Sequence, residues 1–476
     1  MTNPDEHDRP LTPVPSSDAA SPRQLPSAGH DTTWDASVFV ASTWVVLSLA
    51  AMLCTYQFGV NLPYGDSWEL VPVVTGAEPL TARWLWQQHN EHRLPLTKLV
   101  LVVLSRLTSG DARAGMYLNG VGLAATASIL VSGARRLRGR TSYADAFFPI
   151  VLLNLGNHNV MVFDFAMNYV ATVFLASVLL RIMVAVPVAS GWMVPCGAGL
   201  CLIGLILTGA TGLVPALTGA GWLGYAGWVR WRESDPRRRA QGTAMLAGAA
   251  GALLLIGLYF VGYRRPEYHP PSAGVLASLK VAIQFLSLGI GPAGGVGWPF
   301  ATQWGIAGTF VLAGCAASIG LLTWQAWRRP DERVRAVGLA LFLVGAVALA
   351  LAVGWGRSGM SPTEGFSFRY VTLAVLPLVG LYYVWGAYGP PAVRRLVQFG
   401  LFAVVCSALL FNTHDGRSRA RQGRNELAPI AQEIRSGAAP QEIAARHRQM
   451  LYRHASEQQL AAWLEMLRAA RMGPYK

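Results

Sequence analysis

The sequence has few charged side chains. Of its 476 residues, 13% are charged and 53% are hydrophobic, and the mean hydropathy is +0.35. A soluble domain carries about 25% charged residues, so the shortage of charge argues against that class. The apolar stretches are long and continuous, whereas the strands of a membrane β-barrel alternate over roughly 10 residues. We therefore expect an all-α polytopic transmembrane helical bundle.

Cysteine is also scarce, and its spacing lacks the usual motifs. The chain has five cysteines and no CxxC pair, so neither a disulfide framework nor a zinc site is indicated. The HExxH motif of zinc hydrolases is absent as well, so a zinc hydrolase is only weakly supported.

Acidic residues are fewer than basic ones, and the net charge is +14. Such a charge could indicate nucleic-acid binding. The arginine clusters, however, stand beside apolar runs, which fits membrane topology and anionic lipid better. We expect membrane lipids as partners and no nucleic acid.

The N-terminal part of the chain sets the predicted topology. Residues 1–35 are rich in Pro, Ser, Asp and Thr and are predicted to be disordered and cytoplasmic. The apolar run 36–60 is not preceded by a basic region, so we expect a retained span and not a signal peptide. A later span, 112–134, ends in the sequence RRLRGR (Arg135–Arg140), which predicts a cytoplasmic end. The segment 61–111 is then an external loop.

The run Leu94–Leu107 is too short to cross within that loop. It has about 14 residues, interrupted by Lys98 and Arg106, and a span needs about 20. We predict an interfacial helix here, and a re-entrant or interfacial helix at Val275–Ile290.

The remaining apolar runs complete a bundle of about eleven spans. With approximate ends, they are residues 143–155, 165–184, 191–208, 212–231, 242–263, 304–327, 336–353, 370–388 and 396–411. This count predicts a transmembrane catalytic domain over residues 36–412 and an external, helical C-terminal tail over residues 413–476.

The polar loops that could carry chemistry all fall on the same predicted face. They are Tyr64–Pro95, Gly156–Asp164, Tyr263–Pro271 and Gly354–Tyr370. A transporter is expected to carry polar groups near the middle of the membrane, but the predicted spans contain few ionisable residues. The pattern favours chemistry or binding at the outer surface.

Three sequence elements resemble the GT-C glycosyltransferases, including the protein mannosyltransferase and aminoarabinose transferase superfamily. They are YGDSWE after the first span, HRLPLTKLVLVVLSRL in the loop, and a span that ends in GARRLRG. Two details depart from that pattern: Asp66 and Glu69 are not adjacent, and Leu94 replaces the first residue of a proline pair.

The resemblance implies a multi-pass enzyme of a bacterial-type cytoplasmic (inner) membrane, with its active-site loop external. It would transfer a hexosyl or pentosyl group from a polyprenyl-phosphate carrier to a glycan, lipid or protein acceptor of the cell envelope. Asp66 stands at the family's position for the acidic residue of the first external loop.

Asp66 and Glu69 are the candidate catalytic residues. Their spacing of three puts both carboxylates on one face of a helix. One could act as a general base on an acceptor hydroxyl, or the pair could hold a divalent cation, Mg²⁺ or Mn²⁺. The alternative is that they are helix-cap or interface acids. No cofactor is required by the sequence.

Further candidates would bind the substrate. The motif HNEHR could contact a phosphate, a sugar hydroxyl or a metal, or be an ordinary solvated turn; it comprises His89, Asn90, Glu91, His92 and Arg93. Arginines at the predicted external ends of spans could clamp a lipid phosphate, because guanidinium binds phosphate oxygens bidentately. They are Arg264, Arg265, Arg357 and Arg369, the last beside Tyr370. The alternative for these arginines is snorkelling.

Two classes of function remain open at this point besides a non-catalytic scaffold. The first is an outer-face glycosyltransferase that uses a lipid-phosphate sugar. The alternative is a transporter or flippase of lipid-linked glycans, in which the same arginines would guide the phosphate.

Overall fold

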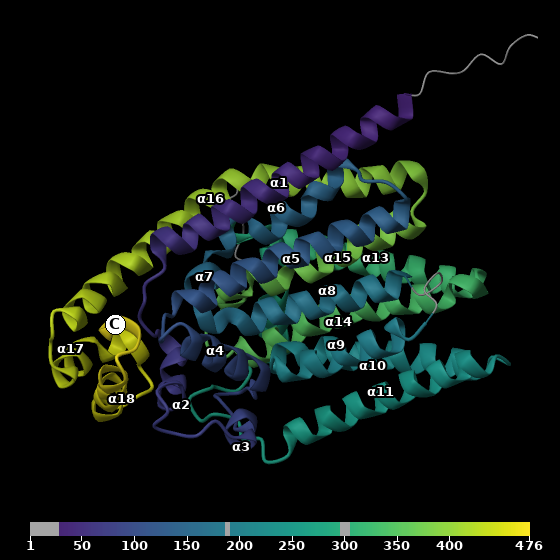
Figure 1. Cartoon of the computed structure of the whole chain (residues 1–476). Coiled ribbons are helices and arrows are strands. Elements are labelled where there is room, and N and C mark those ends of the chain that lie inside the picture. The colour runs from purple at the N-terminus through teal and green to yellow at the C-terminus, as the bar shows by residue number, and fades with distance from the viewer. Residues whose placement is uncertain (1–27, 186–190, 296–304) are drawn as a thin grey trace, which may run out of the picture.

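The described part of the chain is helical from end to end. The structure is a computed structural model that describes residues 28–185, 191–295 and 305–476, and no β-strand occurs within these ranges. Figure 1 shows the long helices lying side by side in one elongated bundle. The predicted all-α architecture is confirmed.

Eight helices in the described ranges are long and apolar enough to cross a membrane. They are α1 (Ala28–Phe58), α5 (Arg113–Arg138), α8 (Met167–Ala185), α11 (Pro236–Phe260), α13 (Ile306–Arg328), α14 (Arg333–Arg357), α15 (Val371–Tyr388) and α16 (Pro391–Arg435). Two further helices pack among them, α9 (Met193–Leu207) and α10 (Ala210–Trp231). Helix α1 begins earlier than the expected Ala36, and residues 1–27 lie outside the described ranges.

One more segment runs between the ends of the bundle beside these ten helices, and it is a broken helix. The expected span 143–155 is helical over η2 (Tyr143–Ala146) and α6 (Phe147–Leu153), and the chain continues past a break as η3 (Leu155–Asn157) and α7 (His158–Val162). Asn154 makes the break, because its side chain accepts from Gly156 N at 2.9 Å and donates to Ile150 O at 2.8 Å. The expected polar loop Gly156–Asp164 is therefore mostly helical, and His158 and Asp164 are buried.

The legs alternate between two ends of the bundle. We call the end that holds segment 61–94 the loop end, and the end that holds Arg138 the arginine end. At the arginine end, Arg335 donates to Val184 O at 3.0 Å and Tyr388 donates to Glu332 at 2.9 Å, which joins the ends of three legs.

Short helices close the loop end of the bundle. They are η1 (Gly65–Leu70), α2 (Val71–Val74), α3 (Ala82–Trp86) and α4 (Pro95–Leu107), gathered at one end in Figure 1. Helix α4 has 13 residues and spans about 20 Å at 1.5 Å per residue, less than the roughly 30 Å of a bilayer core. It packs against α2, α3 and the loop-end parts of its neighbours, as expected for an interfacial helix.

Helix α12 (Val275–Ser287) lies at the loop end of the bundle, where Ser278 contacts Ser358 and Gln284 contacts Pro362 O. The helix continues through η5 (Leu288–Ile290) and η6 (Pro292–Gly294). Asn412 of α16 holds these two short helices, since its side chain donates to Ile290 O at 2.8 Å and accepts from Ala293 N at 2.9 Å. Helix α13 then starts beside Ser287, whose hydroxyl accepts from Gly308 N at 2.8 Å. These contacts keep the whole segment at the loop end, and both expected arrangements, re-entrant and interfacial, stay predictions.

The C-terminal tail folds back onto the first loop. Helix α16 continues past residue 412 to Arg435 and is followed by α17 (Pro440–Tyr452), α18 (Glu457–Ala470) and η10 (Gly473–Tyr475). Buried side chains of these helices form one cluster with Leu62, Trp68 and Val71 of the loop. The loop and the tail therefore lie at the same end of the molecule (Figure 1).

Candidate active site

The HNEHR motif forms a tight turn. His89 N donates to His92 O at 2.7 Å, and His92 N donates to His89 O at 2.8 Å. Asn90 at the tip has a φ of 50°, a left-handed conformation that Asn tolerates better than most residues. The turn therefore presents the side chains of Asn90 and Glu91 together and directs His89 back toward η1.

His89 lies between the two candidate catalytic acids. Its Nε2 is 3.4 Å from Asp66 Oδ1, and its Nδ1 is 2.7 Å from Glu69 Oε2. Burial opposes the charged imidazolium, but the two carboxylates outweigh it and raise the pKa of His89 to about 9. Burial likewise opposes ionisation of Asp66 and Glu69, yet His89 holds the pKa of each below its usual value. The three residues form a carboxylate–imidazolium–carboxylate bridge.

This bridge does not fit the proposed metal site. The two carboxylates face opposite nitrogens of His89 and not a common point between them. Across the described ranges, no group of three or more His, Cys, Asp or Glu side chains is placed to hold a metal ion. We therefore derive no chemical step through a cation.

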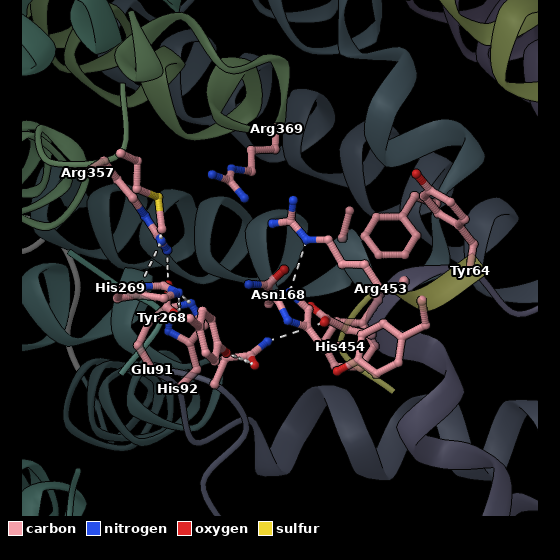
Figure 2. A pocket seen from close by; sticks show the side chains of 18 of the residues that line it. Tyr64, Glu91, His92, Asn168, Tyr268, His269, Arg357, Arg369, Arg453 and His454 are labelled. Atoms are coloured by element: carbon pink, nitrogen blue, oxygen red, sulfur yellow. Dashed lines mark hydrogen bonds and ion pairs between the residues drawn. The ribbon is translucent and has the colours of Figure 1, made fainter. Parts of the chain in front are cut away.

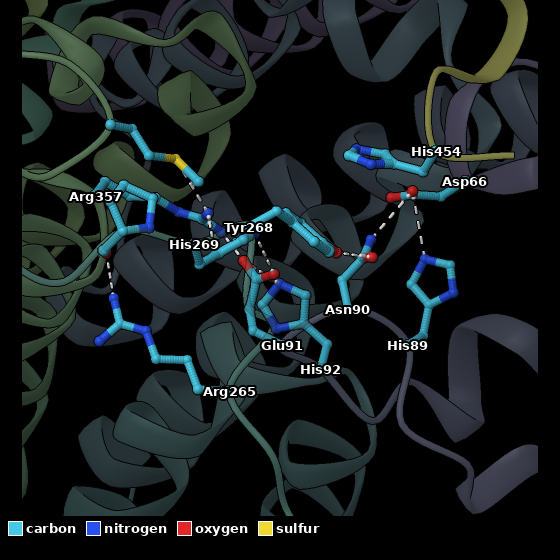
Figure 3. A network of polar contacts seen from close by, with 12 residues as sticks. Asp66, His89, Asn90, Glu91, His92, Arg265, Tyr268, His269, Arg357 and His454 are labelled. Atoms are coloured by element: carbon cyan, nitrogen blue, oxygen red, sulfur yellow. Dashed lines mark hydrogen bonds and ion pairs between the residues drawn. The ribbon is translucent and has the colours of Figure 1, made fainter. Parts of the chain in front are cut away.

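Asp66 has a second neighbour on its other side. Asn90 Nδ2 donates to Asp66 Oδ1 at 3.3 Å, and the Tyr268 hydroxyl donates to Asn90 Oδ1. Figure 3 shows this chain running from the loop that carries Tyr268 to the Asp66 carboxylate. The carboxylate of Asp66 is thus positioned by groups from two separate segments.

Glu91 is the centre of another cluster. It forms an ion pair with Arg357, and its Oε2 lies 3.3 Å from His269 Nε2. His92 Nε2 lies 3.5 Å from Glu91 Oε1. Burial and the charge of His89 lower the pKa of His92 to about 4, and burial and nearby arginines lower the pKa of His269. Both histidines are neutral near pH 7, so Arg357 supplies the positive charge of this cluster.

These clusters line one cavity of about 800 Å³ at the loop end. Its walls come from the first loop, the start of α8, the loop before α12, the segment between α14 and α15, and the end of α17. Asp66 and three arginines, Arg357, Arg369 and Arg453, all line it (Figure 2). The buried Asn168 forms part of its floor.

Two of the arginines point into the cavity and have guanidinium nitrogens that could still donate hydrogen bonds. Arg369 Nη2 donates to Glu364 at 2.6 Å, but its buried Nε has no hydrogen-bond partner in the described residues. Arg453 donates to the neighbouring His454 at 3.2 Å and has no ion pair within the described parts of the chain. Figure 2 shows the ends of both side chains directed into the cavity. An anion placed there could bind both guanidinium groups.

Only some of the residues that the sequence predicted for the site line this cavity. The predicted residues that line the cavity are Asp66, Asn90, Glu91, His92, Arg357 and Arg369. Glu69 and His89 lie behind Asp66, and Tyr370 is buried against Phe285, with ring centroids 5.7 Å apart.

Three of the arginines that were predicted to bind the substrate do not line the cavity. Arg93 is buried, and its guanidinium donates to the carbonyl oxygens of Trp86, Tyr259 and Val261 at 2.7–2.9 Å. Arg264 pairs its backbone with the Gln88 side chain, and the Arg265 side chain donates to Pro270 O. Arg93 therefore joins the first loop to the end of α11.

Sequence reasoning missed the contribution of the tail. Tyr452, Arg453 and His454 line the cavity, and the Tyr452 hydroxyl donates to Glu69. The ring of His454 lies 4.9 Å from that of Tyr268. The signal available in the sequence was the run YRH at 452–454, an aromatic and two basic residues in a tail predicted to lie on the same face as the first loop.

No protein-family model matches the sequence, and no curated protein matches it. The structure is similar to ArnT from Cupriavidus metallidurans bound to undecaprenyl phosphate, with a TM-score of 0.44 and 16% identity, over 90% of this chain and 75% of that chain. It is also similar to the Archaeoglobus fulgidus oligosaccharyltransferase in the apo form, with a TM-score of 0.44 and 11% identity, over 91% of this chain and 64% of that chain.

A second structure of the archaeal enzyme, in complex with zinc and sulfate, matches with a TM-score of 0.40 and 12% identity, over 85% of this chain and 57% of that chain. All three of these structures are 16% identical to this chain or less, and their TM-scores are below 0.5. At these identities and TM-scores the likeness carries no argument about superfamily or activity, and both have to be inferred from the residues of this chain.

Proposed function

We propose that this protein is an integral membrane glycosyltransferase that takes a sugar from a polyprenyl-phosphate carrier. The observation that carries the proposal is a single cavity at one end of a membrane bundle that is lined both by arginines and by an ordered carboxylate. The arginines suit a phosphate leaving group, and the carboxylate suits an acceptor hydroxyl.

Arg369 and Arg453 would hold the phosphate of the carrier. Both enter the cavity, and each has a guanidinium nitrogen free to donate to a phosphate oxygen. Charge-assisted hydrogen bonds of this kind strengthen as negative charge accumulates on the leaving oxygen. Arg357 is already paired with Glu91 and would shape the cavity more than bind the phosphate.

Asp66 would bind and then deprotonate the acceptor hydroxyl. The hydroxyl oxygen forms a bond to the anomeric carbon, the bond from that carbon to the phosphate oxygen breaks with its electron pair, and the hydroxyl proton passes to Asp66. A carboxylate with a low pKa is a weak base, but the hydroxyl becomes strongly acidic as its new bond forms, so late proton transfer to Asp66 is feasible.

We also propose that the cavity opens on the outer face of a bacterial-type cytoplasmic membrane. The arginine end then lies in the cytoplasm, as the distribution of basic residues in the loops favours. The acceptor, a glycan, lipid or protein, would approach from outside, and the domain 36–412 with the tail 413–476 would form one catalytic unit.

The test is transfer by the purified protein. A panel of polyprenyl-phosphate sugars, hexosyl and pentosyl, is incubated with the protein and a mixed acceptor extract, and release of free polyprenyl phosphate is measured. A glycosyltransferase releases the carrier from at least one donor. Movement of intact lipid-linked sugar across liposomes without carrier release would instead establish the transporter.

A further inference from the structure

A second cavity lies at the arginine end of the bundle, on the far side from the candidate active site. Its volume is about 470 Å³, and α1, the end of α5 with the segment after it, and the start of α16 line it. Four of its lining residues are arginines: Arg138, Arg140, Arg394 and Arg395. These arginines come from two segments that are far apart in the sequence but meet around one hollow.

The positive charge of this cavity is largely unbalanced. The buried Asp145 pairs with Arg138 and also accepts from the Tyr382 hydroxyl at 2.7 Å and from Ser142 N at 2.9 Å. Asp145 is not among the residues that line the cavity, and its carboxylate is occupied by these three contacts. Among the described residues, Arg140, Arg394 and Arg395 form no ion pair, and no acid lines the cavity. Like charges around one hollow repel each other unless an anion lies between them.

Neutral donors and an apolar surface complete the environment. The lining includes the hydroxyls of Thr141 and Ser142. Beside it, Phe399 and Tyr143 also line the cavity while 45% and 40% exposed. The ring of Phe39 lies 5.5 Å from that of Tyr143. The hollow thus adjoins a strip of exposed aromatic side chains on the surface of the bundle.

We propose that this cavity binds the phosphate head group of an anionic phospholipid, with the acyl chains lying along Phe39 and Phe399. A preference for basic residues on one side of a membrane explains where these arginines lie, but it requires no cavity between them. A free phosphate ion would use the arginines and leave the apolar strip without a role. A lipid matches both features, as in basic pockets between membrane helices that bind anionic head groups.

Native mass spectrometry of the full-length protein tests the proposal. The purified protein is offered equal amounts of phosphatidylglycerol and phosphatidylcholine, and wild type should retain phosphatidylglycerol preferentially. The triple variant Arg140→Gln, Arg394→Gln, Arg395→Gln should bind it about 10²-fold more weakly. The control triple Arg237→Gln, Arg239→Gln, Arg329→Gln removes the same charge from exposed positions off this cavity and should bind as wild type does.

The remaining outcomes are decisive in either direction. Equal retention of phosphatidylglycerol by the two triple variants would overturn the proposal. Binding of inorganic phosphate as tightly as the lipid would also overturn it, because the apolar strip would then contribute nothing. If the cavity triple does not fold, the single Arg395→Gln change, at an exposed residue, should still weaken binding about 5-fold.

Discussion

His89 is the residue that fixes the two acids of the first loop. Its imidazolium pairs with Asp66 on one side and Glu69 on the other, and its side chain is 1% exposed. Asp66 can therefore be held in place without an arginine or a metal. Asp66, the proposed catalytic acid, and His89 come from separate parts of the same loop.

The pH dependence of stability should report this bridge. The folded-state pKa of His89 is about 9, above the 6.5 of an unfolded histidine. Its contribution to stability is thus fully present below pH 6.5 and is lost as the pH rises through about 9. The melting temperature of wild type should exceed that of His89→Gln at pH 6, and the difference should shrink above pH 9.

Other groups titrate in the same range, so a comparison of variants is needed. Burial lowers the pKa of Lys98 to about 8, but Lys98 is present in both proteins. His414→Gln, which changes an exposed histidine of α16 away from the bridge, serves as the control variant. A pH-independent difference between wild type and His89→Gln would show that His89 is not charged in the folded protein.

Arg453 is expected to bind the lipid phosphate directly. Loss of one charge-assisted hydrogen bond costs about 1.5–3 kcal/mol, and Arg453 is exposed at the cavity wall, so we expect the lower part of that range. Arg453→Gln should weaken binding of polyprenyl phosphate about 10-fold, measured by competition. The control Arg421→Gln removes an exposed arginine of α16 and should bind normally. Equal affinities would assign Arg453 to the solvated surface.

At the scale of elements, the tail completes the site that the loop begins. Trp68 of η1 is fully buried in the cluster formed by the loop and the tail helices. Truncation of a buried Trp to Ala costs about 3–5 kcal/mol, enough to release the tail. We expect Trp68→Ala to accelerate proteolysis within residues 436–476 and to reduce activity. The matched change Trp222→Ala removes an equally buried Trp of α10 from the other core cluster and should leave the tail protected. A tail that stays protected in both variants would show that its docking does not depend on Trp68.

The sidedness of both elements can be tested by labelling. In a background without the five native cysteines, we introduce Ala77→Cys in the first loop, Ser436→Cys after α16 and Ser234→Cys at the arginine end, all exposed positions. A membrane-impermeant maleimide added to intact cells should modify the first two and spare the third. Labelling of Ser234→Cys would show that the orientation is the reverse of the predicted one. Labelling of only one of the first two positions would contradict the predicted number of spans.

Elements were predictable from the sequence where hydrophobicity alone decides them. The eight helices that are long and apolar enough to cross a membrane follow from the length of apolar runs, and so does the short length of α4. The span 143–155 was predicted to end at the break beside Asn154, but the residues after it were predicted as a polar loop and are the short helices η3 and α7. The last span was predicted to end near residue 411 with a helical tail after it; in the structure α16 runs through that boundary as one helix to Arg435, with Pro429 inside it.

At the scale of the whole molecule, the site joins segments that no local pattern links. Asp66 and Glu91 were found because they share one dense polar stretch. Arg453 and Tyr268 were not, because their relevance comes only from the packing of the tail and of the loop before α12 on that stretch. Likewise, Arg93 was predicted to bind the substrate, but its guanidinium donates hydrogen bonds to three backbone carbonyl oxygens. Spatial convergence was the missing information in each case.

The central claim is that the Asp66 carboxylate accepts the proton of an acceptor hydroxyl beside a bound lipid phosphate. The most direct measurement is the rate of sugar transfer by Asp66→Asn, together with its affinity for polyprenyl phosphate. The amide keeps the size of the side chain but cannot accept the proton, so turnover should fall about 10²-fold or more while the affinity and the yield of folded protein stay at wild-type levels. Wild-type turnover by Asp66→Asn at wild-type abundance would contradict the account.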